Sequence, residues 1–149
     1  MTDSSSLTRA HARRRALNDA MTQLEKALAG PAAAEGWLDR VEDSLAGLRE
    51  GLEAHVAEVE GPRGLLAEIV DVAPRLAAAT RELEDEHGLL LAACDRAERK
   101  LEAIRGSVTP DGVALRRRLT TLLGRVTLHR QRGADLVYEA YNVDIAAAD

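Results

Sequence analysis

The four histidines of this chain each lie 19 residues from a helix-breaking glycine or proline. The pairs are His11 and Gly30, Gly36 and His55, His87 and Gly106, and Pro110 and His129. If four helices run alternately up and down, these glycines and prolines form the turns at one end. A rise of 1.5 Å per residue then places every histidine roughly 28 Å above that end. The spacing therefore predicts one layer of four histidines in a helical bundle, and such layers are where bundles build metal sites.

The composition favours helices throughout a single domain. The chain has 149 residues, of which 46% are hydrophobic and 30% charged, and it contains no Phe. Alanine, leucine, glutamate and arginine are abundant, and all four are good helix formers. Because this length suffices to bury a sizeable core, we expect one domain over residues 1–149 with a core of aliphatic side chains.

Apolar residues at helical spacing predict four long helices between clear stop signals. The expected helices start after the serines at 4–6 and end before Gly30, run from Trp37 to Glu60, extend from Pro74 to Arg105, and begin again at Thr109-Pro110, with a short helical segment over 64–72. Proline cannot continue the hydrogen bonds of a helix, so Pro74 must kink or restart the third one. We predict an all-α fold, an up-down-up-down four-helix bundle with its third helix kinked or restarted near Pro74.

Three of the histidines lie on the apolar faces of their predicted helices. His55, His87 and His129 are each central on such a face, whereas His11 lies about 90° from the inner stripe of its helix. A histidine on an apolar face is usually a core residue whose ring nitrogens are hydrogen-bonded. Three at one height can also converge on zinc, iron or copper. Glu58, three residues after His55, is the candidate carboxylate one turn higher.

Two further residues on inner faces bear on this layer. Arg14 points inward by periodicity, three residues from His11, and Glu58 or Glu60 is its expected partner in a polar upper layer. A cation at that place would oppose metal binding. Gly133 stands one turn above His129 and leaves space beside that ring.

Three segments around the histidines carry a family resemblance: LEAHVAEVEGPRGLL, LEDEHGLLL and LHRQRGADLVYEAY. Together with one histidine on each predicted helix, they make the chain resemble divergent members of the hemerythrin-like (HHE cation-binding) family. The resemblance covers essentially the whole chain. The family pattern is an early histidine, then HxxxE, then HxxxH, then HxxxxD or HxxxE, and it holds a non-haem di-iron centre.

The resemblance implies a reduced version of that centre. It implies that His11 is the early histidine and that His55 is the histidine of HxxxE. It also implies that His87 is the first histidine of HxxxH and that His129 is the histidine of the last motif. Glu58 follows His55 by three residues rather than four, Leu91 replaces the second histidine of HxxxH, and Gly133 and Ala134 occupy the last carboxylate positions. Two iron ions need bridging carboxylates that this set does not supply. We therefore predict at most one metal ion, iron or zinc, held by some of His55, His87, His129, Glu58 and His11.

Three functional hypotheses follow. The first is a hemerythrin-like protein with a mononuclear site for metal binding or for oxygen or redox sensing, without di-iron oxygen carriage. The second is a metal-free structural or protein-interaction bundle with the histidines in its core. The third, a DinB-like metal-dependent thiol transferase, ranks last because the fourth helix lacks that family's HxxxH. No serine or cysteine stands in a recognisable catalytic motif, so we do not expect an enzyme unless a bound metal provides the chemistry.

Net charge, hydropathy and cysteine content limit which partners and which cellular location we expect for this chain. A net charge of −5 argues against nucleic acid. The chain has no run of 18 apolar residues and no apolar signal segment near its start, so we expect no membrane insertion and a cytoplasmic location. The single cysteine, Cys94, permits no internal disulfide and is typical of a buried thiol. A homodimer or a protein partner would fit the alanine-rich helix surfaces.

Overall fold

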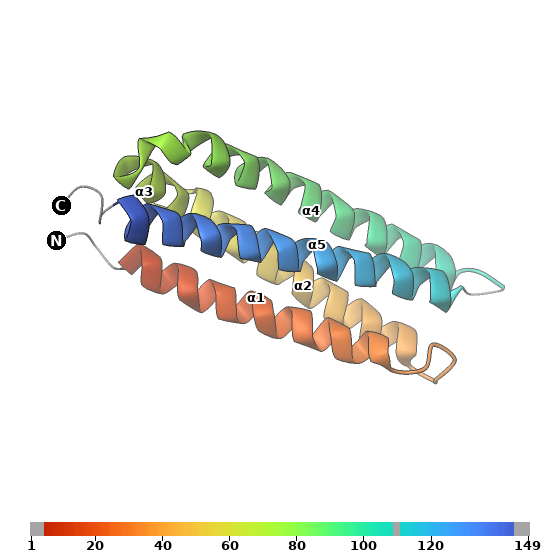
Figure 1. Cartoon of the computed structure of the whole chain (residues 1–149). Helices are drawn as coiled ribbons and strands as arrows, with labels where there is room; N and C mark the ends of the chain where they lie inside the picture. The colour runs from red at the N-terminus through yellow and green to blue at the C-terminus, as the bar shows by residue number, and fades with distance from the viewer. Residues whose placement is uncertain (1–4, 109–110, 145–149) are drawn as a thin grey trace.

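The structure, a computed structural model that describes residues 5–108 and 111–144, is an all-α four-helix bundle. Its long helices are α1 (Ser5–Ala29), α2 (Trp37–Glu60), α4 (Ala77–Arg105) and α5 (Gly112–Tyr138). They run alternately up and down (Figure 1). The remaining elements are the short helix α3 (Leu65–Val72), the 3-10 turn η1 (Pro74–Leu76) and the π-helical segment η2 (Glu139–Asp144). The fold class predicted from the sequence is confirmed.

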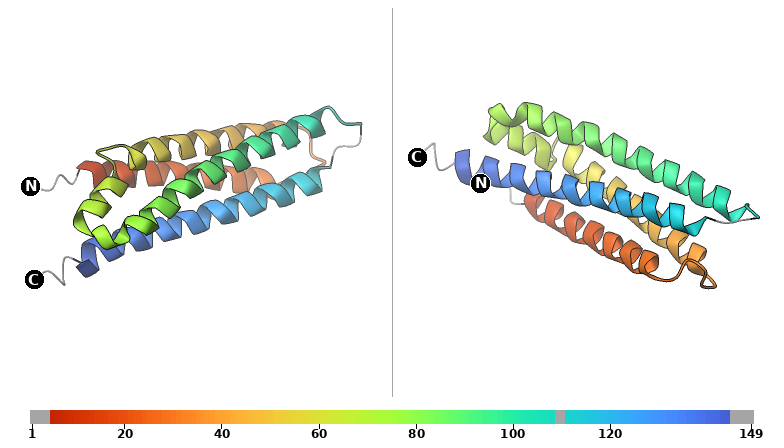
Figure 2. Two further views of the ribbon diagram at one scale, coloured as in Figure 1. Left: turned by 90° about the horizontal axis from the view of Figure 1, so that it is seen from above. Right: turned by 45° about the vertical axis from the view of Figure 1, so that its right-hand side comes forward.

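Pro74 restarts the third long helix rather than bending it. Ala73, the residue before the proline, has φ −138° and ψ 77°, outside the helical region, as the steric demand of a following proline requires. The chain then makes the turn η1 and continues directly into α4. α3 is therefore a separate short helix that approaches α4 at an angle (Figure 2).

The start of the last helix differs from the sequence-based expectation. The predicted cap and first-turn proline, Thr109 and Pro110, lie outside the described residues. In the described part the helix begins at Gly112, and Asp111 is its N-cap, accepting a hydrogen bond from the Ala114 backbone N–H at 2.9 Å. A side-chain oxygen at this position satisfies one of the unpaired N–H groups of the first turn. Asp111 therefore performs the capping role that the sequence pattern assigned to Thr109.

The histidines interrupt an otherwise aliphatic core. One buried cluster fills the bundle around Leu48 and Leu119, and a second lies around Ile69 at the end covered by α3. On α2, His55 falls between Leu52 of the first cluster and Val59 of the second, and α4 and α5 repeat this arrangement. The histidine layer is thus the boundary between the two clusters.

The end of the bundle beyond the histidines is closed by α3, η1 and η2 (Figure 1). The Tyr141 hydroxyl donates to Glu68 at 3.1 Å, and Arg75 forms a 2.9 Å ion pair with Glu139, so η2 is tied to both α3 and η1. The segment that joins α2 to α4 therefore also covers the histidine layer. Within the described residues, every helix is too short or too polar to cross a lipid bilayer.

Candidate metal centre

Three histidines from three helices meet in the centre of the bundle. The ring centroids of His55, His87 and His129 are 4.7 to 5.7 Å apart, and one nitrogen from each ring lies within 4.8 Å of the other two. His87 and His129 are only 3% and 2% exposed. Ligand nitrogens of a tetrahedral zinc ion are roughly 3.4 Å apart, given Zn–N distances of about 2.0–2.1 Å. The rings would have to close by roughly 1.4 Å at most to reach that geometry, which side-chain rotations can provide.

His11 and Glu58, both named as candidate ligands from the sequence, are not part of this group. The side chain of His11 is exposed to solvent. Glu58 accepts a hydrogen bond from Arg9 Nε at 2.6 Å, on the outer side of the bundle. The equal spacing of His11 gives it the right height, but its rotation of about 90° from the inner stripe turns the ring away. The predicted layer of four histidines is a layer of three.

Two glutamates that the sequence reasoning did not assign to the site orient two of the rings. His87 Nδ1 donates to Glu60 Oε1 at 2.5 Å, and His129 Nδ1 donates to Glu86 Oε1 at 2.8 Å. The other oxygen of Glu86 is bound by Arg132 at 2.6 Å. A carboxylate on Nδ1–H fixes the tautomer and leaves the lone pair on Nε2, which is the usual arrangement around a metal-bound histidine.

His55 differs from its two neighbours because its Nδ1 is buried and no described residue forms a hydrogen bond with it. A buried polar atom without a partner costs about 1–3 kcal/mol of stability. Histidines that serve only as core residues normally have both ring nitrogens satisfied. His55 Nδ1 is therefore the observation that most favours a ligand in this layer.

The three converging histidines are neutral at physiological pH. Burial, and after it the charge of the neighbouring rings, lowers the pKa of His55 to about 3 and the pKa of His87 to about 4. Burial also lowers the pKa of His129, although its hydrogen bond with Glu86 acts in the opposite direction. Metals bind the neutral imidazole, so no proton has to be displaced near pH 7.

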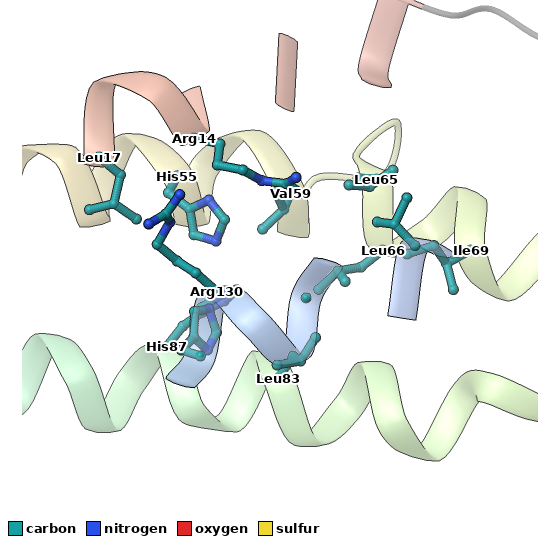
Figure 3. Close-up of a pocket in the computed structure, with 13 residues that line it drawn as sticks. Arg14, Leu17, His55, Val59, Leu65, Leu66, Ile69, Leu83, His87 and Arg130 are labelled. Atoms are coloured by element: carbon teal, nitrogen blue, oxygen red, sulfur yellow. The ribbon is translucent and has the colours of Figure 1, made fainter. Parts of the chain in front are cut away.

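A cavity of about 40 Å³ adjoins the three rings (Figure 3). Its walls include the apolar side chains of α3, and Gly133 faces open space there, since a Cβ added to it would meet no atom within 4 Å. Arg14 and Arg130 also line the cavity. The expectation that Arg14 pairs with Glu58 or Glu60 is wrong, because Glu58 binds Arg9 and Glu60 binds His87.

Cys94 takes no part in the site. It lies on α4 within the aliphatic cluster, is 0% exposed, and burial raises the pKa of its thiol to about 11. A thiol in this state is a weak nucleophile and a poor metal ligand, because both roles need the thiolate. Its role is packing, as predicted from the sequence.

Comparison with protein-family models, with curated proteins and with solved structures finds no match to this chain. The function therefore has to be inferred from the site itself. Its donor set suits one metal ion: three neutral imidazoles converge and can leave a further coordination position free. It does not suit two iron ions, because among the described residues no carboxylate joins the group of converging ligand atoms.

Proposed function

We propose that this bundle binds one transition-metal ion, iron or zinc, through one ring nitrogen each of His55, His87 and His129. The observation that carries the proposal is the buried, unpartnered Nδ1 of His55, whose ring centroid lies 5.3 and 5.7 Å from the centroids of two other neutral histidine rings. Three nitrogen ligands leave the ion able to act as a Lewis acid or, for iron, as a redox centre. Such a site suits metal binding or redox sensing by a reduced relative of the hemerythrin-like proteins.

The alternative is a metal-free interaction or structural bundle. The hydrogen bonds from His87 to Glu60 and from His129 to Glu86 favour it, because they satisfy these rings as in an ordinary core. They do not distinguish the two functions, since the same hydrogen bonds support metal-bound histidines. His55 favours the metal site, because no described residue gives its buried Nδ1 a partner, whereas a bound metal ion would.

Metal content tests the proposal directly. Protein prepared without a histidine tag and dialysed against zinc or iron(II) should hold about one ion per chain by elemental analysis. His55→Ala and His129→Ala should each lose the ion, because two imidazoles are too few to hold it in place. His11→Ala is the matched control and should keep it, since that ring lies exposed. Two ions per chain, or none in the wild type with helical circular dichroism intact, would refute a mononuclear site.

The two orienting glutamates should also matter for affinity. Glu60→Gln and Glu86→Gln should each weaken metal binding by about 10- to 100-fold, because an amide orients the imidazole less well and polarises it less. Glu58→Gln is the matched control on α2, and its affinity should stay at the wild-type value because Glu58 binds Arg9 instead. Competition titration with a chelating dye gives the three dissociation constants. A loss in Glu58→Gln as large as that in Glu60→Gln would contradict the observed geometry.

A further inference from the structure

Two arginines share the cavity beside the histidines. Arg14 reaches it from α1 and Arg130 from α5; the Arg130 side chain extends to beside His55, and the Arg14 side chain extends toward Val59 (Figure 3). Arg130 Nη1 donates to Asn18 Oδ1 at 3.1 Å, whereas Arg130 Nε is buried and has no hydrogen-bond partner among the described residues. Within the described part of the chain, neither arginine forms an ion pair with a carboxylate. Two guanidinium groups without a carboxylate partner among the described residues therefore line the same small cavity, and the Nε–H of Arg130 is a hydrogen-bond donor without an acceptor there.

Two other arginines in the described structure are neutralised by several carboxylates each. Arg49 is paired with Glu53, Asp95 and Glu98, and Arg105 is paired with Asp39 and Glu42. The cavity walls, in contrast, contain no acidic side chain. Arg14 and Arg130 both line this cavity, so two positive charges adjoin the same small space. An anion between them would supply the missing counter-charge.

The size and shape of the cavity limit that anion. One water needs roughly 10–15 Å³, so a cavity of about 40 Å³ has room for about three non-hydrogen atoms. The apolar side chains of Leu17, Val59 and Ile69 form much of the remaining wall. The planar fork of a guanidinium matches an anion that presents two oxygen atoms. The structure thus favours a small, flat anion over a phosphate or a larger carboxylate.

We propose that Arg14 and Arg130 form a binding subsite for a small two-oxygen monoanion, of the formate or nitrite type, beside the three histidines. The subsite goes beyond the metal site and does not require it, because the uncompensated charges belong to the protein. If the histidines hold a metal, the anion also reduces the repulsion between that ion and the arginines. Each ligand then raises the affinity of the other by the same factor, in the usual range of about 5- to 150-fold.

Binding of ¹³C-labelled formate, followed by NMR on the metal-free and the zinc-loaded protein, tests the subsite. The wild type should bind formate and should not bind formamide, a neutral molecule of similar shape. Arg130→Gln and Arg14→Gln should each weaken formate binding by about 10- to 100-fold, the effect of losing a hydrogen bond from a charged donor. Arg118→Gln, an exposed arginine on the same helix as Arg130, is the matched control and should bind as the wild type does.

The outcomes for the anion and for the metal are separable. Formate binding that depends on Arg130, in a protein that takes up neither zinc nor iron(II), would refute the metal site and support the subsite. Zinc binding without formate binding to either form, or equal formate binding by the wild type and Arg130→Gln, would overturn the subsite and leave the metal site standing. Circular dichroism of each variant confirms that the helical fold is retained in the comparison.

Discussion

At pH 5 the metal-free protein should have a free energy of unfolding about 4 kcal/mol lower than at pH 8. The cause is the burial of the histidine layer, which lowers the pKa of His55 to about 3 and of His87 to about 4. In the unfolded chain these side chains take up a proton near pH 6.5, whereas in the folded protein they remain neutral at pH 5. Each of the two therefore contributes about 2 kcal/mol of acid destabilisation, and His129 adds to it because its pKa is also lowered.

The direction of the effect follows from proton uptake. Between pH 6.5 and about 4 the unfolded state binds more protons than the folded state, so stability falls as the pH falls. Glu60 acts in the opposite direction: burial raises the pKa of its carboxyl group, so the folded state binds that proton more readily. Its side chain is 33% exposed, so solvent screens the effect and it offsets only a small part of the histidine contribution.

Urea denaturation of the metal-free protein at pH 8, 7, 6 and 5 measures this slope. The His11→Ala variant is the control, because it removes a histidine whose ring is exposed and should leave the acid-induced loss at its wild-type size. A free energy of unfolding that stays constant from pH 8 to pH 5 would show that the three rings are solvated or charged in the folded protein, contrary to the structure.

The sequence predicted the heights of the histidines but not all of their directions. Equal distances from the turns placed the four rings in one layer, and the three rings on central apolar positions do converge. His11 does not join them, since it lies on a flank of α1 and its side chain is exposed. Axial position depends on counting residues, whereas the direction of a flanking side chain also depends on how each helix is turned in the bundle.

The orienting glutamates could not be predicted for the same reason. Glu86 is next to His87 in sequence, yet it binds His129 on α5. Glu60 is five residues after His55, a rotation of roughly 140°, and it binds His87 on α4. Both are flank residues, and their partners depend on which helix lies on that side. The spacing of apolar residues predicts which residues face the core and which face solvent, but it does not predict which helix lies beside a flank residue.

Replacing His55 with leucine should stabilise the metal-free protein by about 1–3 kcal/mol and abolish metal binding. The gain is expected because leucine removes the buried Nδ1 that has no partner, and it has a similar size and apolar neighbours such as Leu17 and Val59. In zinc at a thousandfold excess over its dissociation constant, the wild type should gain about 4 kcal/mol and the variant nothing. Urea denaturation with and without zinc measures both effects.

The matched variant is His87→Leu, which should also lose the zinc response but should not stabilise the metal-free protein. Its ring is already hydrogen-bonded, and its removal leaves the Glu60 carboxylate without a partner. A His55→Leu variant less stable than the wild type in the absence of metal would identify His55 as an ordinary core residue and favour the metal-free bundle. If the His55→Leu variant is more stable than the wild type and its free energy of unfolding does not change with zinc, His55 lowers the stability of the metal-free protein. A histidine that lowers the stability of the empty protein is best explained by a ligand that its buried Nδ1 would bind.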